Sequence, residues 1–516
     1  MKFQRRRLLP AAAAMLAVLF VVIGNGGSAN AGLVSPGQGP QVSGKSAAEW
    51  PLHNYDLANT RDVAHSPINS ANVSSLKVKW RMPLTATGPF GAFAANPTVV
   101  DGVIYLQDLK SNVYAVRRGN GALIWKHTFD VPNLGPNGVV HGWGMVFGGT
   151  TTDAFALDAG TGAVLWSRRL TRTDGEGIDL APQLAGNTVV ISTVPGTLAG
   201  YLPGGMGIVY GLDPTTGATK WSFNTVKDGD LWGHPEINSG GGVWYPPAVD
   251  DQGRVFFGTG NPAPFPGVPG YPNGSSRPGD NLYTNSLVAL DGRTGRLLWY
   301  NQVVPHDIRD YDLAVSPIIA YLSIRGVRTE VLLTAGKNGY VYAFRATDGQ
   351  MIWQRPVGTH QNDVGPLPDT PVPVMPGMGG GVVTPIAFAD GRLFVPWVDA
   401  ASQESSTTIT FPDVTNGTGG LTGIDATTGK TLWERQLPRI VLGAATVAND
   451  VVFTSTFDGH IYAFDTRSGK TLWTATARAG INSFPAVAGD MLLVGAGVPG
   501  FFPNPQPELI AYELSG

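Results

Sequence analysis

Cysteine is absent from the 516 residues, so this sequence offers no disulfide, no thiolate metal site and no thioether-attached haem. Charged residues are also scarce, at 14% of the chain, and the net charge of −3 gives no sign of a nucleic-acid partner. Glycine and proline are abundant instead, with 69 and 40 residues, and 43% of the residues are hydrophobic. This composition argues against disorder and favours many short strands joined by tight turns.

The N-terminus carries a basic and then apolar segment typical of a secretory signal peptide. The apolar run Leu8–Ile23 follows four basic residues and precedes the small-x-small triplet Ala29-Asn30-Ala31. We predict a signal peptide over residues 1–31 because the run is short for a membrane span, with an uncleaved anchor as the alternative. Cleavage changes the net charge from −3 to −7, since it removes four basic residues and no acidic one. We therefore expect a secreted or periplasmic protein without a stable membrane span, in which residues 32–49 form a flexible lead-in.

The rest of the chain repeats one motif. Each unit ends in a strand, an Asp-x-x-Thr-Gly-like turn and a strand that contains tryptophan. Asp caps such a turn and Gly adopts its positive φ. The seven equivalent tryptophans, which we expect to pack between neighbouring units, are Trp125, Trp166, Trp221, Trp299, Trp353, Trp433 and Trp473. Spacings of roughly 40 to 50 residues with four strands per unit predict the blades of a β-propeller.

The two ends of the repeat region complement each other. Trp80 lies in an isolated strand, Leu76–Met82, whereas the last three strands, Phe484–Val487, Met491–Val494 and Leu509–Leu514, are followed by no Trp strand. We therefore predict an all-β fold, an eight-bladed propeller with four-stranded blades, over residues 50–516. The N-terminal strand is expected to complete the C-terminal blade and close the ring, which removes exposed strand edges.

Polar residues occur at positions that this fold places on one face, near the axis. Asn261 follows the second strand of the central blade, Asp310 lies on the link to the next blade, and Lys337 follows that blade's second strand. Trp244 begins the first strand of the central blade, directly after three glycines. Asn and Asp oxygens suit a hard cation such as calcium, a carboxylate can act as a general base, and an ammonium stabilises negative charge.

Each of these residues also has a purely structural interpretation. Asn261 is a good turn residue, Lys337 fits a plain loop, and Trp244 fits a core position. Asp310 could be a surface carboxylate paired with Arg309.

Three motifs follow one another in the same region. They are Gly258-Thr259-Gly260-Asn261-Pro262-Ala263-Pro264, Arg277-Pro278-Gly279-Asp280-Asn281 and Pro305-His306-Asp307-x-x-Asp310. In order and spacing they resemble the signature of pyrroloquinoline-quinone (PQQ) dependent alcohol dehydrogenases, which are eight-bladed propellers of the methanol dehydrogenase type. The resemblance runs from about Trp50 to the C-terminus and is strongest over residues 240–339. It implies an exported quinoprotein dehydrogenase that oxidises a small or polymeric alcohol to a carbonyl.

The resemblance implies a role for each candidate on the metal side of the site. Asn261 would coordinate the metal through its side-chain oxygen. Asp310 would take the alcohol proton and also ligate the metal. Asp312 matches an extra carboxylate that resembles the lanthanide-using branch, so the implied metal is calcium or a lanthanide ion.

On the cofactor side, the implied group is PQQ. Trp244 matches the Trp on which the quinone ring lies, and Lys337, with Asn338 beside it, matches an Arg or Lys that reaches the quinone oxygens. Because the chain has no haem-attachment motif, electrons would pass to an external acceptor such as a cytochrome or a dye.

The sequence departs from the family pattern in three places. It lacks the two adjacent cysteines that often cover the quinone, and Thr197 falls where a metal-binding Glu is expected. An Arg that clamps a quinone carboxylate is expected near Asn137 and is missing. These losses support an alternative function, a non-catalytic propeller that binds protein or polysaccharide.

Overall fold

The structure is a computed structural model that describes residues 48–86, 88, 90–197, 200–411 and 414–515. These residues belong to one compact unit, Ser35–Gly516. The predicted signal peptide and nearly all of the predicted lead-in lie outside the described residues. Within the described ranges, no helix is long and apolar enough to cross a membrane.

The fold is all-β, and most strands belong to antiparallel sheets of four. The first four sheets are β3–β6 (Thr98–Val100, Val103–Gln107, Val113–Arg117, Leu123–His127), β7–β10 (Val140–Gly142, Met145–Gly149, Asp153–Asp158, Val164–Arg169), β11, β12, β15 and β16 (Gln183–Ala185, Thr188–Ser192, Ile208–Leu212, Thr219–Asn224), and β18, β19, β21 and β22 (Ala248–Val249, Arg254–Gly258, Ser286–Asp291, Leu297–Gln302).

Four further sheets follow in the C-terminal half. They are β23–β26 (Ile318–Ile324, Val327–Ala335, Tyr340–Arg345, Met351–Pro356), β28, β29, β32 and β33 (Ala387–Ala389, Arg392–Asp399, Thr418–Asp425, Thr431–Leu437), β34–β37 with β1 added (Thr446–Ala448, Val451–Ser455, His460–Asp465, Thr471–Thr476; Asp62–Val63), and β38–β40 with β2 (Ala486–Ala488, Met491–Ala496, Glu508–Leu514; Leu76–Pro83). This organisation is consistent with the predicted β-propeller.

Short elements occupy the loops between these sheets. The small strand pairs and the small sheet are β13–β14 (Gly196–Thr197, Gly200–Tyr201), β17–β20 (Ser239–Gly240, Pro262–Ala263) and β27, β30 and β31 (Val372–Val374, Ser402–Glu404, Ile409–Thr410). The short 3-10 turns are η1 (Val73–Ser75), η2 (Lys227–Gly229), η3 (Leu231–Gly233) and η4 (Pro272–Gly274).

Burial differs between inner and outer strands in the way that the repeat predicts. All five residues of β8 are buried, so that strand is covered on both faces. In the outer strand β10 only Trp166 is buried. Since Trp166 is the one buried side chain of an otherwise exposed strand, it can attach the outer edge of its sheet to the neighbouring sheet.

The tryptophan contacts between sheets confirm the packing prediction. Trp125 Nε1 donates to the carbonyl of Ala159 at 3.0 Å, in the turn of the next sheet. The same bond recurs from Trp80 to Arg118, Trp166 to Pro214, Trp221 to Gly292, Trp299 to Ala346, Trp353 to Ala426 and Trp433 to Thr466. The ring also covers the turn glycine, because a Cβ on Gly162 would lie 2.6 Å from Trp125.

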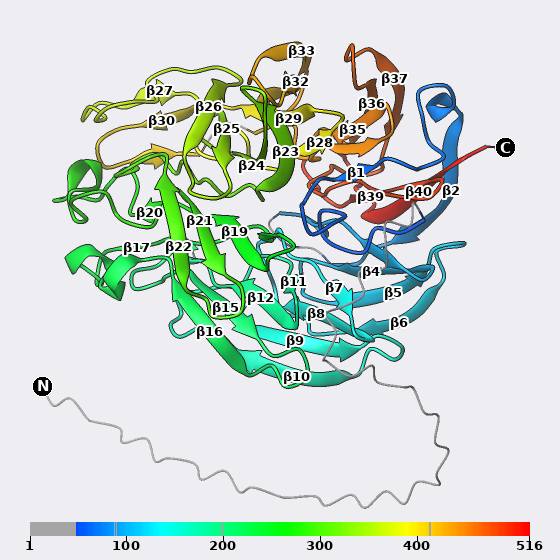
Figure 1. Cartoon of the computed structure of the whole chain (residues 1–516), viewed down its shortest axis with the longest axis horizontal. Coiled ribbons are helices and arrows are strands. Elements are labelled where there is room, and N and C mark those ends of the chain that lie inside the picture. The colour runs from blue at the N-terminus through cyan, green and yellow to red at the C-terminus, as the bar shows by residue number, and fades with distance from the viewer. Residues whose placement is uncertain (1–47, 87, 89, 198–199, 412–413, 516) are drawn as a thin grey trace, which may run out of the picture. The chain divides into compact units, whose positions relative to one another are not determined.

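The last tryptophan of the repeat behaves differently. Trp473 packs edge-on against Tyr512, with ring centroids 5.2 Å apart. It has no turn to cover because β40 is paired on its outer side by β2 from the N-terminal part of the chain. The pairing runs antiparallel from Leu76 opposite Leu514 to Pro83 opposite Glu508, and Figure 1 shows β2 in blue beside β40 in red.

The segment before β2 makes a series of contacts that sequence reasoning did not anticipate. Its backbone bonds in turn to inner strands of five sheets, through Val99, Val249, Ile319, Phe388 and Val447. Arg61, which is fully buried, donates from this segment to the carbonyls of Ala445 and Pro485. The N-terminal segment therefore ties the inner strands together on one side.

One predicted boundary is wrong. We expected Trp244 to begin the first strand of the central sheet, but β18 contains only Ala248 and Val249. Pro246 and Pro247 separate the two, and because proline has no N–H it cannot donate to a strand ladder. Trp244 therefore lies in the loop that enters the sheet.

Candidate active site

Two buried charged residues, Asp307 and Arg277, hold the loop that carries Asp310. The carboxylate of Asp307 accepts the backbone N–H groups of Arg309 at 2.8 Å and Tyr311 at 2.6 Å. The guanidinium of Arg277 donates to the Asp307 carbonyl at 2.6 Å and to the Pro264 carbonyl at 2.9 Å. These bonds fix the loop on both sides of Asp310 and join it to the segment after β19.

Asp310 is buried, with 3% of its surface exposed, and its φ of 64° lies in the left-handed region. Backbone strain of this kind often marks functional residues. Its Oδ2 accepts from Lys337 Nζ at 3.0 Å, while its Oδ1 has no hydrogen-bond partner among the described residues. A surface pair with Arg309 is therefore wrong; Arg309 instead donates to loop carbonyls such as that of Gly365.

Lys337 joins the two candidate carboxylates. Its Nζ lies 3.0 Å from Asp310 Oδ2 and 2.5 Å from Asp312 Oδ2. Asp312 Oδ1 in turn accepts the backbone N–H of Asn261 at 2.6 Å. Residues from three segments, after β19, before β23 and after β24, thus meet at one buried point.

Trp244 lies directly beside this cluster. A Cβ on Gly260 would be 2.8 Å from Asp312 Oδ1 and 3.0 Å from Trp244 Nε1, so only glycine fits between them. At the far edge of the indole, a Cβ on Gly196 would be 3.3 Å from the ring. Trp244 Nε1 has no hydrogen-bond partner within the part of the chain that the structure describes.

Electrostatics within the cluster are set by burial and by the three charges. Burial raises the pKa of Asp310 to about 8; the charge of Lys337 opposes the rise and that of Asp312 adds to it. Burial disfavours the charged form of Lys337, but the two carboxylates outweigh it and raise its pKa. At neutral pH the Lys337 ammonium therefore stays charged. The pKa of Asp310 lies close to neutral pH, so this carboxyl group can both take up and release a proton.

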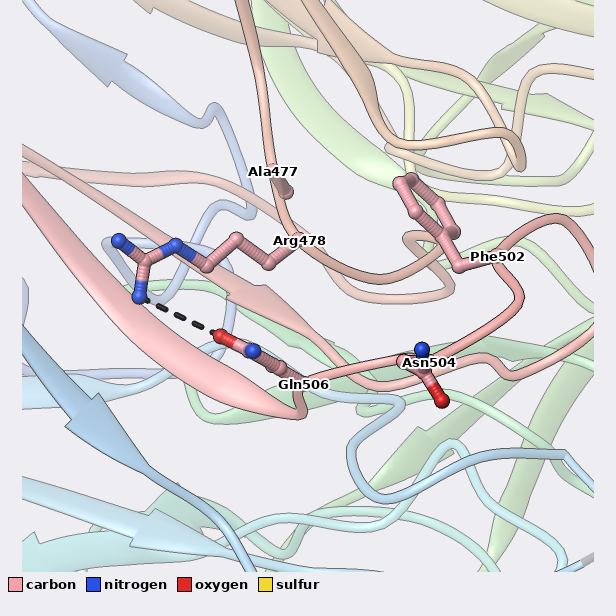
Figure 2. Close-up of a pocket in the computed structure, with 5 residues that line it drawn as sticks. All are labelled: Ala477, Arg478, Phe502, Asn504 and Gln506. Atoms are coloured by element: carbon pink, nitrogen blue, oxygen red, sulfur yellow. Dashed lines mark hydrogen bonds between the residues drawn. The ribbon is translucent and has the colours of Figure 1, made fainter.

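A separate cavity of about 500 Å³ lies at the surface between β37 and β38 and in the loop before β40. It is lined by Ala477, Arg478, Phe502, Asn504 and Gln506. Figure 2 shows Arg478 Nη1 facing Gln506 Oε1, which are 3.4 Å apart. None of the predicted site residues lines this cavity, so it does not belong to the cluster around Lys337.

Comparison with known proteins matches different parts of the chain to two family models. Residues 172–362 match the family described as "Glucose/ethanol/alcohol dehydrogenase, beta-propeller domain", and residues 70–201 and 374–500 match that of "Outer membrane protein assembly factor BamB". The quinohemoprotein alcohol dehydrogenase ADH IIB of Pseudomonas putida is 28% identical over 86% of this chain and 71% of its own. The lanthanide-dependent methanol dehydrogenase of Methylacidiphilum fumariolicum is 27% identical over 86% of this chain and 82% of its own. In sequence the chain is similar to PQQ-dependent alcohol dehydrogenases.

Solved structures agree at the level of the fold. The quinohemoprotein alcohol dehydrogenase of Comamonas testosteroni superposes with a TM-score of 0.79 at 24% identity, over 92% of this chain and 82% of that one. A europium-containing methanol dehydrogenase superposes with a TM-score of 0.76 over 91% of this chain and 99% of that one.

The donor set fits a hard cation, with fewer carboxylates than the family pattern implies. Asp310 Oδ1 is an unpartnered acceptor, Asp312 lies beside it, and Asn261 Oδ1 receives only a long contact of 3.5 Å from the Tyr201 hydroxyl. Among the described residues, no group of three or more His, Cys, Asp or Glu is placed to hold a metal. Thr197, at the expected Glu position, lies in β13.

A planar quinone ring also fits the site. Trp244 is only partly buried, and glycines border it where larger side chains would crowd the indole. Asn338 fits less well as a cofactor contact, because its Nδ2 donates to the Tyr342 hydroxyl at 2.6 Å. Asn137, near the expected arginine, uses its Nδ2 on the carbonyl of Asp108 and leaves Oδ1 without a partner among the described residues.

Sequence reasoning missed several buried residues in and around the candidate site. The holding role of Asp307 and Arg277 depends on contacts between distant segments and leaves no local signal. Asp179 is a buried carboxyl group whose Oδ2 lacks a partner in the described ranges. It could have been found by aligning the sheets on their first strands, because it then falls opposite Trp244.

Proposed function

We propose that this protein is an exported quinoprotein dehydrogenase that oxidises an alcohol to a carbonyl. The observation that carries the proposal is the buried Asp310–Lys337–Asp312 cluster, which lies beside the partly buried Trp244. A plain scaffold gains little from such a cluster, because the burial of three charges is costly. A function at this site would explain why the charges are there. The family relationship gives the cluster its reaction class.

Asp310 is the residue we assign as general base. Its Oδ1 is free of hydrogen bonds to the described residues and can accept the proton of an alcohol hydroxyl. The pKa of Asp310, about 8, lies close to neutral pH. At such a pH a general base is partly ionised and also binds the proton well. Lys337 holds the other oxygen, so the carboxylate has one orientation.

Trp244 and Lys337 would hold PQQ, and Asn261, Asp310 and Asp312 would hold calcium or a lanthanide ion. PQQ, when bound, would supply the two-electron oxidising capacity that conversion of an alcohol to a carbonyl requires. Asp310 would take up the hydroxyl proton of the alcohol. Lys337 supplies a fixed positive charge where negative charge develops. We infer an external electron acceptor, such as a cytochrome, because the sequence has no haem-attachment cysteine.

We also infer that the eight large sheets form an eight-bladed ring. The support is the Trp80 bond to Arg118, which links the sheet of β2 to that of β3, in the same way as the bonds between the other sheets. Export rests on the N-terminal signal pattern in residues 1–31.

The test is a titration of purified protein with PQQ alone, with calcium, with a light lanthanide and with neither. Quinone absorbance reports binding, and dye reduction by simple alcohols reports activity. Asp310→Asn should lower kcat by about 10²- to 10⁴-fold, the range for removal of a general base. Asp251→Asn, a change at an exposed loop carboxylate, should leave kcat unaltered.

Full activity in both Asp310→Asn and Lys337→Ala would refute the site assignment. Failure of the unaltered protein to bind PQQ under every condition would favour the second candidate, a non-catalytic binding propeller. That alternative is favoured by the loss of the expected Glu at Thr197 and by the match of two segments to the BamB family.

A further inference from the structure

A buried carboxyl group that the proposed mechanism does not use lies one sheet away from Trp244. Asp179 is 1% exposed, and its Oδ2 has no hydrogen-bond partner within the described ranges. The backbone N–H of Leu134 donates to the carboxyl group. A buried carboxyl oxygen without a hydrogen-bond partner is costly, so the retention of Asp179 in a sheet entrance calls for a partner that the described residues do not supply.

Asp179 occupies the position in its sheet that Trp244 occupies in the next. Each lies four residues before the first paired residue of the inner strand, Gln183 in β11 and Ala248 in β18. The two inner strands β11 and β18 are neighbours in space. Asp179 and Trp244 therefore stand at equivalent positions at the entrances of two neighbouring sheets.

A segment around Val194 lies between Asp179 and Trp244. Gly177, just before Asp179, exchanges hydrogen bonds of 2.9 and 2.8 Å with Val194. Val194 in turn lies against the Trp244 segment, since a Cβ on Gly242 would be 3.1 Å from it. Gly196, two residues further along, borders the Trp244 ring. Asp179 is therefore separated from the indole by one strand-like segment.

Tyr201 links Asp179 to the carboxylates around Lys337 electrostatically. Burial raises the pKa of Tyr201, and the carboxylates of Asp310, Asp312, Asp179 and Asp307 raise it further, so Asp179 and Asp310 act on the same hydroxyl group. Lys337 is the cation of the cluster and pairs with Asp310 and Asp312.

We propose that Asp179 contacts the cofactor, and that its carboxylic acid donates a hydrogen bond to a carboxylate of PQQ lying on Trp244. This inference rests on the proposed function and assigns a further residue to its binding site. Asp179 could replace the arginine that is expected near Asn137 to bind a quinone carboxylate and that this sequence lacks. Asp179 accepts a hydrogen bond from Leu134, which lies in the loop that leads to Asn137. Burial raises the pKa of Asp179 to about 8, which keeps the donor form populated at neutral pH.

The experiment is equilibrium dialysis of the apo-protein against PQQ at a fixed calcium concentration, at about pH 6.5 and about pH 9.5, on either side of the Asp179 pKa. The variants are Asp179→Asn, which keeps a donor that cannot ionise, and Asp179→Ala, which has none. Glu404→Gln is the matched control, because Glu404 is a buried carboxyl with a pKa raised to about 7 by burial but lies in β30 beside Ser402. Circular dichroism confirms that each variant is folded.

At about pH 6.5, Asp179→Ala should bind PQQ about 10- to 100-fold more weakly, the usual loss for a hydrogen bond to a charged group. Asp179→Asn should bind nearly as well as the unaltered protein, and it should lose less affinity at the higher pH, where ionised Asp179 repels the cofactor. Equal affinity of Asp179→Ala and the unaltered protein would overturn the inference. Parallel pH profiles for the unaltered protein and Asp179→Asn would also overturn it, because Asp310, whose pKa is also about 8, is common to both. Absence of PQQ binding by the unaltered protein would instead refute the proposed function.

Discussion

Replacement of Asp179 by Asn should stabilise the apo-protein in a strongly pH-dependent way. In the fold, burial raises the pKa of Asp179 to about 8, whereas an Asp in an unfolded chain titrates near about 3.9. Between these values the folded state holds a proton that the unfolded state has released. Proton linkage therefore lowers the stability of the unaltered protein as pH rises from about 4 to about 8.

The magnitude follows from the two pKa values. From about pH 5 to about pH 8 the linkage amounts to about 2.7 pH units, and at about 1.36 kcal/mol per unit the stability lost is about 3.7 kcal/mol. Asn cannot ionise and loses none of it. The free-energy advantage of Asp179→Asn should therefore grow by about 3.7 kcal/mol between these two pH values, while its advantage at about pH 4 should be close to zero.

The assay is urea denaturation of both proteins at the two pH values, compared as a difference of differences so that all other titrating groups cancel. Asp251→Asn, at an exposed carboxylate, serves as the control and should show no growth of the gap. A constant gap between Asp179→Asn and the unaltered protein across this pH range would refute the reasoning. It would mean that Asp179 is solvated or paired in solution.

Three further predictions concern the site and the fold. Lys337→Met should destabilise the protein by about 3 to 5 kcal/mol by urea denaturation, because it leaves two buried carboxylates without a cation, and Lys337→Arg should recover part of that loss. Asp307→Asn should lower kcat more than it raises KM in dye-reduction kinetics, since it loosens the loop that orients Asp310; an unchanged kcat would contradict this. Gly162→Ala should cost about 2 to 4 kcal/mol, because a Cβ there would lie 2.6 Å from Trp125. Gly102→Ala is its control, with the same φ of 74° and no atom within 4 Å, and should cost only about 1 kcal/mol of backbone strain.

The repeat made the fold accessible from the sequence, because turn and tryptophan signals are local. Asp caps its own turn, Gly adopts positive φ, and Trp follows a fixed number of residues later, so each signal lies within one short window. The contact from Trp125 to the next turn follows directly from that pattern. The entry of Trp244 into its sheet was placed wrongly, since two prolines delay the strand.

The residues of the candidate site could be predicted from the sequence, but their pairing could not. Asn261, Asp310, Lys337 and Trp244 were identified from their positions after or between strands, and the fold brings them together. The pairing of Lys337 with two carboxylates could not be read from the sequence, because charge pairing depends on side chains that approach from different sheets.

By itself, the sequence determined the strand repeat, the turn chemistry and the similarity to PQQ-dependent alcohol dehydrogenases. Only the tertiary structure decided which carboxyl groups are buried. Burial depends on neighbours contributed by remote segments, as when Leu134 and Val194 enclose the region of Asp179. Since desolvation sets the pKa of Asp310 and Asp179, the tertiary structure also decided which of these groups can exchange protons near neutrality.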